Sequence, residues 1–163
     1  MRISILDKTH NRQNFECEEQ ALTNYIRRQA SQDVKKRLAA CFVAVDKDEN
    51  VVGYYTLTSE SLGRESIPDA YLKKVPQNYN APVILLGRLA RDKKEKGRGL
   101  GEHLLLDALF RSYKLSSESI GAMAVVVDPI SEHAVRFYKR YGFELLPDSG
   151  KMFLPMNTIK QLM

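Results

Sequence analysis

Three glycines within five residues, in the stretch KGRGLG (96–101), constrain the fold of this chain more than any other feature. They follow the apolar run VILLGRLA (83–90) and precede EHLLLDALFRSY, which has the apolar spacing of a helix. Glycine loses more backbone entropy on folding than any other residue, so the turn must need bare backbone. A strand that leads through such a turn into a helix directs unpaired amides and the positive end of the helix dipole at one place. The segment therefore predicts an anion site, most simply for phosphate.

Two familiar phosphate-binding motifs do not fit this turn. A Walker loop needs Lys and then Ser or Thr after its last glycine, whereas Glu102 and His103 follow Gly101. The dinucleotide fingerprint GxGxxG would need a glycine at position 102 if it began at Gly97. The pattern that remains is KxxGxG. By itself, a glycine-rich connection that binds no ligand is an equally good interpretation of it.

The order of the other segments predicts a single α/β domain over residues 1–163. A chain of 163 residues with 44% hydrophobic residues can bury one substantial core. The expected strands are 2–6, two within 41–62 around the turn DKDEN, 83–90, 121–127 and the short runs FELLP and KMFLP. The expected helices are 18–40, with Asp33 as a candidate start of a second helix, a short helix in the polar loop 63–82, about 98–113 and about 131–140. These connections imply a mixed sheet with helices on its faces.

Composition excludes several classes of protein. Cys17 and Cys41 stand without a CxxC motif or a His/Cys cluster, which argues against a disulfide framework and against a metal site. The N-terminus is charged too early for a signal peptide, and no segment approaches the roughly 20 apolar residues of a membrane span. We therefore expect a cytoplasmic protein that does not enter the membrane. The net charge of +5 favours anionic partners.

Two further stretches accompany the glycine turn and identify a family. LLGRLARD (85–92) precedes the turn, and SEHAVRFYKRYGFE (131–144) lies thirty residues beyond it. In this order they resemble the splayed strand, the RxxGxG or QxxGxG pyrophosphate turn and the NxxAxxFYxxxGF segment of the GNAT acyltransferases. The stretches FECEEQALTNYI (15–26), SQD (31–33), GYYTLTSESL (53–62) and VPQNYNAPVILLGRLARD (75–92) are similar to the GNAT toxins of bacterial type II toxin–antitoxin modules. The resemblance covers nearly the whole chain and implies the GNAT acyl-CoA N-acyltransferase fold, whose mostly antiparallel central sheet is flanked by helices.

The resemblance implies acetyl-CoA as cosubstrate, no metal, and a catalytic tyrosine. Tyr138, in RFYKRYGF, is the residue that matches that tyrosine. A phenol stays protonated at pH 7 and can donate its proton to a departing thiolate. The alternative is a partly buried aromatic whose hydroxyl merely finds a partner. Amides around Leu89 to Arg91 are expected to stabilise the oxyanion, and amides of Arg98 to Gly101 to hold the pyrophosphate. The residues expected to bind the cofactor are Leu89, Ala90, Arg91, Lys96, Gly97, Arg98, Gly99, Leu100, Gly101, Ser131 and Phe137.

Two of these residues depart from the family pattern. Lys96 stands where Gln or Arg is usual, which keeps a positive charge but loses the planar fork of an arginine. Ser131 stands where Asn is usual, and it can cap the following helix instead of contacting the cofactor.

The function implied by the resemblance is a toxin that acetylates the α-amino group of aminoacyl-tRNA and so blocks translation. An α-amine titrates about two pKa units below a lysine side chain, so this acceptor offers a neutral nucleophile without a strong enzymatic base. No convincing base is found in the sequence. The basic residues expected to contact RNA, for which a solvated surface is the alternative, are Lys35, Lys36, Arg37, Arg88 and Lys93.

The resemblance also implies a homodimer and a ribbon-helix-helix antitoxin encoded nearby, whose disordered tail would cover the toxin. Two other functions remain open at this point. One is acetylation of a small amine or of a protein N-terminus. The other is a non-catalytic regulatory module that binds CoA or RNA.

Overall fold

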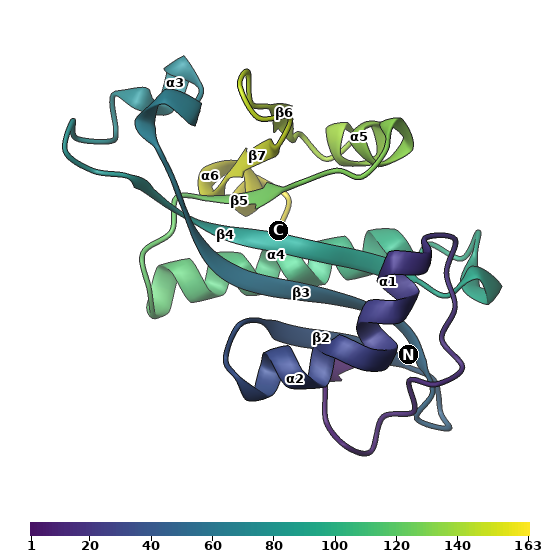
Figure 1. Ribbon diagram of the computed structural model, residues 1–163. Coiled ribbons are helices and arrows are strands. Elements are labelled where there is room, and N and C mark those ends of the chain that lie inside the picture. The colour runs from purple at the N-terminus through teal and green to yellow at the C-terminus, as the bar shows by residue number, and fades with distance from the viewer. The chain divides into compact units, whose positions relative to one another are not determined.

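The computed structural model describes residues 1–163, which form two compact units. The first unit consists of Met1–Thr58 and Gly87–Ala108, and the second of Ser59–Leu86 and Leu109–Met163. The strands form one seven-stranded sheet in the order β1-β2-β3-β4-β5-β7-β6 (Figure 1). They are β1 (Arg2–Ile5), β2 (Ala40–Val45), β3 (Val51–Leu62), β4 (Ala81–Arg91), β5 (Ala124–Val127), β6 (Glu144–Leu145) and β7 (Met152–Pro155).

Helices connect most of these strands. The α-helices are α1 (Gln20–Asn24), α2 (Ala30–Lys35), α3 (Asp69–Leu72), α4 (Leu100–Glu118), α5 (Glu132–Lys139) and α6 (Met156–Gln161). A π-helical turn, η1 (Tyr25–Gln29), joins α1 to α2, and short 3₁₀ turns are η2 (Arg64–Ser66) and η3 (Lys93–Glu95).

The expected mixed sheet is confirmed. The pairs β1–β2, β2–β3, β5–β7 and β6–β7 are antiparallel, and β4–β5 is parallel. The β2–β3 hairpin turns at the predicted DKDEN segment. There Asp46 Oδ1 accepts hydrogen bonds from the amides of Asp48 (2.9 Å) and Asn50 (3.0 Å), which is typical chemistry for a turn.

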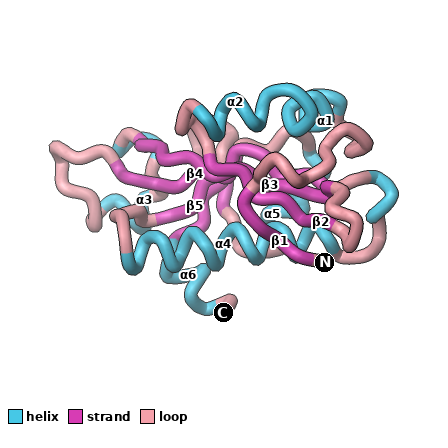
Figure 2. The backbone as a smooth tube through the Cα atoms, turned by 90° about the horizontal axis from the view of Figure 1, so that it is seen from below, coloured by secondary structure: helices cyan, strands magenta, loops and turns pink.

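In the first unit, β3 is buried on both faces because helices cover each side. Tyr54 points toward α1 and donates from its hydroxyl to the carbonyl of Leu22 at 2.6 Å. Tyr55, the next residue, points to the opposite face and donates to Asp107 Oδ2 of α4 at 2.5 Å. Figure 2 shows α1 and α2 on one side of these strands. The apolar cluster between them includes Phe15, Ile26, Ala30, Val43 and Tyr54.

The second unit has its own core around β5 and β7. All four residues of β5, AVVV, are buried, as expected for a strand that is flanked on both edges and covered on both faces. Phe153 of β7 lies in a cluster with Leu62, Val83 and Val126, and its ring centroid is 5.6 Å from that of Tyr71 near the end of α3.

Three features of the helices differ from the sequence-based expectation. Asp33 does not start a second helix; it lies inside α2, which continues directly from α1 through the π-helical turn. The helical segment also ends at Lys35, earlier than expected, and Arg37 follows in the left-handed region with φ of 62°. The sequence analysis also missed α6, which begins immediately after Pro155.

Replacing Tyr54 with Phe tests how the first unit is held together. The ring and its packing are kept, but the Leu22 carbonyl loses its donor, so we expect a loss of about 1 kcal/mol in the free energy of unfolding. Replacing Tyr54 with Ala removes the buried ring as well and should cost about 3–5 kcal/mol. Denaturant titration of both variants measures these values. Equal losses in the two variants would contradict the assignment of the larger share to packing.

Candidate functional site

Asp92 anchors the start of the glycine turn at the end of β4. This residue is only 3% exposed, and its carboxylate accepts hydrogen bonds from the amides of Glu16 (3.1 Å) and Lys94 (2.9 Å). Its own amide donates to the Val52 carbonyl at 2.7 Å. The backbone that enters the turn is therefore fixed on several sides. The sequence analysis did not single out Asp92, although an Asp that bonds the amide two residues later is a known turn signal.

The glycines of the turn are required by backbone conformation and not by packing. Gly97 and Gly99 have φ of 82° and 75°, a region that residues with a side chain rarely adopt. Apart from its own neighbours along the chain, a Cβ atom at Gly97, Gly99 or Gly101 would have no protein atom within 4 Å. The turn is thus open on the side where these side chains would stand.

Several amides of the turn have no partner in the protein. The Arg98 amide donates to the Glu95 carbonyl at 3.3 Å, and the first amide in the helical ladder is that of His103, which donates to the Gly99 carbonyl at 3.0 Å. The amides of Gly99, Leu100 and Gly101 lie between these two, at the N-terminus of the 19-residue helix α4. Free amides and the positive end of the helix dipole together suit a phosphate group.

Charged side chains surround the turn, and some are already paired. Lys96 is exposed, and the exposed Arg98 has its Nη1 3.7 Å from Glu95 Oε1. Just before the turn, Arg91 pairs with Glu18 at 3.4 Å, and Lys93 pairs with Glu16 at 2.8 Å. Lys96 and Arg98 are therefore the cations of the turn that are best placed to meet an anion.

The pairing of β4 with β5 ends before β4 does. The parallel register runs from Val83–Ala124 to Leu86–Val127, where β5 stops, while β4 continues to Arg91. From Gly87 onward, β4 therefore has no partner in β5. This matches the splayed strand that the stretch LLGRLARD predicted, and it includes Leu89, Ala90 and Arg91.

In the second unit, α5 holds Tyr138 in an aromatic cluster. Its ring lies edge-on to those of Phe137 and Phe143, each at a centroid distance of 5.3 Å. Tyr138 is 9% exposed, and burial raises the pKa of its phenol above the ordinary value. No hydrogen bond or charged neighbour contributes to that pKa shift. A buried phenol that is protonated and uncommitted to a protein acceptor can serve as a proton donor.

The other two residues expected near the cofactor also lie at α5. Ser131 caps the helix, because its Oγ accepts a hydrogen bond from the Ala134 amide at 3.1 Å. Phe137 is half-buried, with its ring 5.4 Å from that of Tyr141 and the guanidinium of Arg140 at 5.6 Å from its centroid. The predicted capping role of Ser131 is thus observed.

One acidic side chain was missed by the sequence analysis. Glu60, near the end of β3, has one carboxylate oxygen, Oε2, that is buried without a hydrogen-bond partner. Its other oxygen, Oε1, lies 3.5 Å from Lys151 Nζ. Such a carboxylate can accept a hydrogen bond from an ammonium group. No local motif marks Glu60, so only the structure could indicate it.

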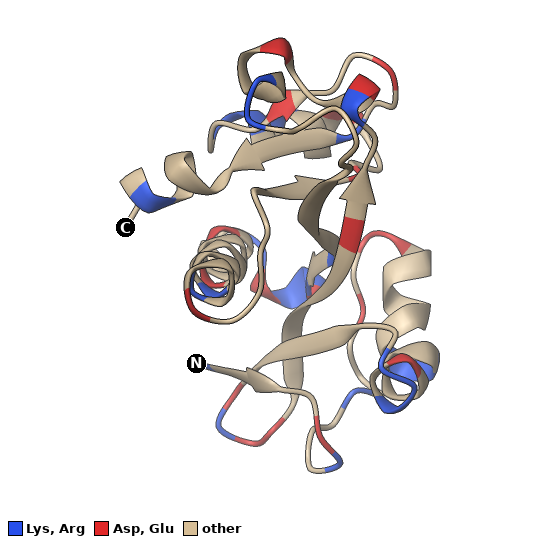
Figure 3. Cartoon of the chain, turned by 90° about the vertical axis from the view of Figure 1, so that its left-hand side faces the viewer, with Lys and Arg blue, Asp and Glu red and all other residues tan.

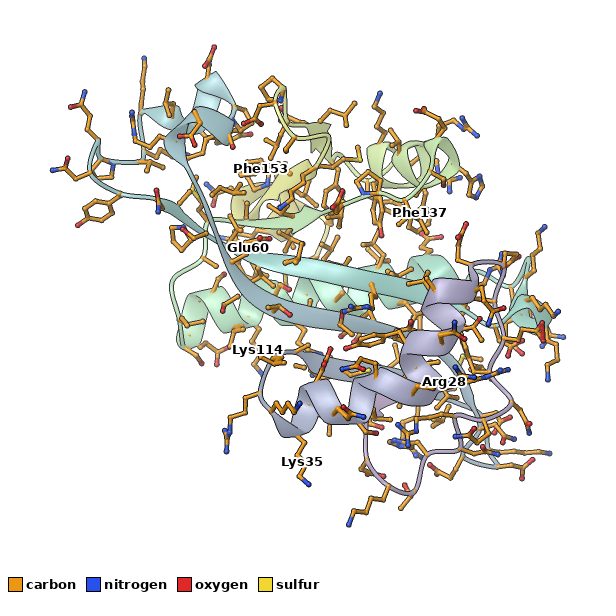
Figure 4. The ribbon with its side chains drawn as sticks, viewed as in Figure 1. Arg28, Lys35, Glu60, Lys114, Phe137 and Phe153 are labelled. Carbon is orange, nitrogen blue, oxygen red and sulfur yellow. The ribbon has the colours of Figure 1, made fainter.

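The basic residues expected to contact RNA differ in their surroundings. Lys35, Lys36 and Arg37 are exposed at the end of α2 and have no salt bridge, and Figure 4 shows Lys35 projecting away from the strands. Lys93 is paired with Glu16 as described above. Arg88 is half-buried on β4 and lies over an aromatic ring. Figure 3 marks the Lys and Arg residues of the chain in blue.

Comparison with known proteins gives the family. The model of the acetyltransferase (GNAT) domain matches residues 37–145. The chain belongs to the GNAT acetyltransferase family. A tRNA-acetylating toxin of Mycobacterium tuberculosis is 39% identical over 150 residues, which are 91% of this chain and 88% of that protein.

Solved structures of related toxins have a similar fold over nearly the whole length of this acetyltransferase. The toxin AtaT in complex with acetyl-methionyl-tRNAfMet has a TM-score of 0.90 and 28% identity, covering 99% of this chain and 98% of that one. A tyrosine-to-phenylalanine mutant of AtaT, bound to acetyl-CoA and to the C-terminus of the antitoxin AtaR, has a TM-score of 0.83 and 26% identity, covering 99% and 97%. The predicted membership in the toxin branch of the family, the GNAT fold and the acetyl-CoA-dependent acetyltransferase activity are confirmed.

Two kinds of feature are absent from the acetyltransferase. None of its helices has the length and apolarity needed to cross a bilayer. No group of three or more His, Cys, Asp or Glu side chains is arranged to hold a metal ion.

Replacing Gly99 with Val tests the glycine turn. A β-branched residue resists positive φ, and its side chain would fill the open side of the turn, so acetyl-CoA affinity should fall by at least tenfold, about 1.4 kcal/mol. Isothermal titration calorimetry with acetyl-CoA measures the loss. Gly150→Val is a matched control, because Gly150 also has a positive φ (76°) and open space around it. An equal loss in both variants, or none in either, would remove the turn from the cofactor site.

Replacing Tyr138 with Phe tests the proton donor. If the hydroxyl protonates the leaving thiolate, the turnover rate should fall by about two to four orders of magnitude with little change in acetyl-CoA affinity. Because burial raises the pKa of Tyr138, the wild-type phenol stays protonated as the pH rises, and the rate should show no decline from its ionisation between about pH 7 and 10. Stopped-time assays across this range measure both effects. Full turnover by the Phe variant would make Tyr138 a packing residue.

Proposed function

We propose that this acetyltransferase transfers the acetyl group of acetyl-CoA to the α-amino group of aminoacyl-tRNA, and that it thereby blocks translation. The observation that carries the choice of acceptor is the similarity over 99% of the chain to AtaT, a relative solved with acetyl-methionyl-tRNAfMet. The 39% identity to a tRNA-acetylating toxin supports the same acceptor. A tRNA whose aminoacyl group has been acetylated lacks the free amine needed to accept a growing peptide.

In the proposed reaction, residues of the first unit bind the pyrophosphate of acetyl-CoA and stabilise the oxyanion. The free amides of Gly99, Leu100 and Gly101 hold the pyrophosphate, together with the exposed cations of Lys96 and Arg98. Backbone amides around Leu89 to Arg91, on the part of β4 that has no β5 partner, stabilise the oxyanion. These groups are preorganised because Asp92 fixes the backbone immediately after them.

The protons of the reaction must balance. The neutral α-amine forms a bond to the acyl carbon and loses one proton, while the sulfur leaves and takes one up. Tyr138 supplies the proton to the sulfur from a phenol that is buried and protonated. The α-amine needs no strong enzymatic base, because a substantial fraction of it is already neutral near pH 7.5.

Partners of the protein follow from its relatives. Because AtaT binds the C-terminus of the antitoxin AtaR, we propose an antitoxin of the ribbon-helix-helix type encoded next to this protein. Its C-terminal tail would cover the toxin in the complex. We also propose that the toxin acts as a homodimer.

The acceptor is tested by offering alternatives to the purified protein. The protein is incubated with acetyl-CoA and either charged tRNA, deacylated tRNA, free amino acids, a polyamine or lysine peptides, and the products are identified by mass. We expect acetylation of the aminoacyl group of charged tRNA only. Because each phosphate contact releases counterions, the apparent affinity for tRNA should fall steeply between low and moderate salt. Acetylation of a polyamine or a peptide, with charged tRNA left unmodified, would overturn the proposal.

Neutralising the end of α2 tests the RNA surface in the same assay. We expect the triple variant Lys35→Gln, Lys36→Gln, Arg37→Asn to weaken tRNA binding and to reduce its salt dependence. Asn is chosen at position 37 because Arg37 has a positive φ, which Asn tolerates. The control removes three exposed charges elsewhere, with Lys8→Gln, Lys47→Gln and Lys160→Gln. Equal losses in the two triple variants would show only a general effect of net charge.

A further inference from the structure

Side chains from three segments, none of which has a role in the proposed chemistry, meet at one point of the first unit. Arg88 comes from β4, Tyr25 from the π-helical turn η1, and Asp33 from α2. The guanidinium carbon of Arg88 lies 3.6 Å from the centroid of the Tyr25 ring. The Tyr25 hydroxyl donates to Asp33 Oδ2 at 2.8 Å, and Gln29 Nε2 donates to Asp33 Oδ1 at 2.9 Å. We call Tyr25, Gln29 and Asp33 the Arg88 frame.

The frame depends on the π-helical turn. An α-helix advances about 100° per residue, so the separation of eight positions between Tyr25 and Asp33 would leave their side chains roughly 80° apart around a regular helix. A π-helical turn takes up one extra residue, which removes most of this offset and brings both side chains to the same face. The irregular backbone is therefore what allows the Tyr25 hydroxyl to reach Asp33.

The platform beneath Arg88 is rigid. The ring of Tyr25 is stacked on that of Tyr54, with centroids 6.1 Å apart and planes 18° from parallel. Tyr54 is fully buried and fixed by its hydrogen bond to the Leu22 carbonyl. At its other end, Tyr25 is held through its hydroxyl by Asp33. The Tyr25 ring is thus restrained both by stacking on Tyr54 and by the hydrogen bond of its hydroxyl group to Asp33.

Arg88 contacts the Tyr25 ring through its guanidinium group, and its N–H groups have no partner in the protein. A guanidinium that lies flat on an aromatic ring uses its π surface there, while its N–H groups point outward in the plane. Arg88 takes part in no salt bridge or hydrogen bond within the protein, although it is half-buried. The hydrogen bonds from Gln29 and Tyr25, and then the charge of Arg88, hold the pKa of Asp33 below its ordinary value, so Asp33 is an anion that attracts Arg88 without occupying its N–H groups.

We propose that Arg88 is a preorganised, two-pronged receptor for a phosphate group of the substrate, and that Tyr25, Gln29 and Asp33 are positioning residues that hold it. The phosphate we assign is a backbone phosphate at the acceptor end of the tRNA, and in this respect the inference rests on the proposed function. Two placements favour RNA over the coenzyme. First, Asp33 lies on α2, which ends next to the exposed cations at 35–37. Second, Ala90 belongs to the same core cluster as Tyr25, and Arg88, two residues before it on β4, therefore points to the face of the sheet that carries α1 and α2.

The test compares binding of deacylated tRNA, which needs no chemistry, with binding of acetyl-CoA. For Arg88→Gln we expect tRNA affinity to fall about tenfold and the slope of log affinity against log salt to decrease by about 0.7, the value for one phosphate on a single strand. Arg88→Lys keeps the charge but lacks the fork, so it should lose affinity while keeping most of the slope. Acetyl-CoA affinity should stay unchanged in both variants. Lys47→Gln serves as the control for loss of one exposed charge.

A double-mutant cycle separates positioning from general stability. If Tyr25 acts through Arg88, Tyr25→Leu should weaken tRNA binding in the wild type but cost almost nothing further in the Arg88→Gln background. The milder variants Tyr25→Phe, which keeps the ring, and Asp33→Asn, which keeps the shape, give the same cycle should the Leu variant fail to fold. The KM for charged tRNA should rise in these variants, while the KM for acetyl-CoA stays constant.

The outcomes distinguish the inference from the function on which it rests. A wild-type protein that neither binds tRNA nor acetylates its aminoacyl group would refute the proposed function. Wild-type tRNA binding that Arg88→Gln leaves unchanged, or full additivity of the Tyr25 and Arg88 losses, would refute the inference alone. A loss confined to acetyl-CoA affinity would also refute the inference, because Arg88 would then bind a phosphate of the coenzyme and not of the tRNA.

Discussion

The buried carboxylate of Asp92 is the constraint on which the rest of the first unit's functional geometry depends. It accepts hydrogen bonds from the amides of Glu16 and Lys94, and its own amide is bonded to the Val52 carbonyl. Through its side chain and its backbone amide, this one residue therefore joins the N-terminal loop, β3 and the turn after β4. On either side of Asp92, the backbone departs from regular secondary structure. Before it, β4 runs on without a partner in β5, and after it the chain passes through two residues with positive φ.

The groups left without partners in the protein have complementary chemical properties. The turn at 97–101 offers amide donors, Arg88 offers a planar cation, and Tyr138 offers a phenol whose pKa is raised by burial. The Tyr138 phenol is buried, where a polar group normally has a partner, whereas the glycine turn and Arg88 are accessible to a ligand. Their number and kind suit a substrate that carries phosphates and a leaving group that needs a proton. The family relationship gives the same account independently of the geometry.

Much of the fold could be predicted because its signals are local. The hairpin turn at DKDEN, the glycines at positive φ and the Ser131 cap are each determined by residues within a few positions of one another. The errors arose where tertiary contacts override local preference. Asp33 resembles a helix start, yet in the structure its carboxylate accepts from Tyr25 and Gln29 inside α2. The π-helical turn has no sequence signature, since it is stabilised by what its side chains contact and not by their propensities.

The sequence by itself determined the strand, turn and helix order, the need for bare backbone at Gly97 and Gly99, and the family to which the chain belongs. Only the tertiary structure decided which charged residues remain available for a ligand. Lys93 and Arg91 were equal to Arg88 as cations in the sequence, but the folded chain pairs them with Glu16 and Glu18, more than seventy residues away. Arg88 instead lies over the ring of Tyr25, and its N–H groups form no hydrogen bond or salt bridge within the protein. The physical reason is that backbone conformation depends on near neighbours along the chain, whereas the pairing of charges depends on distances in space that only folding sets.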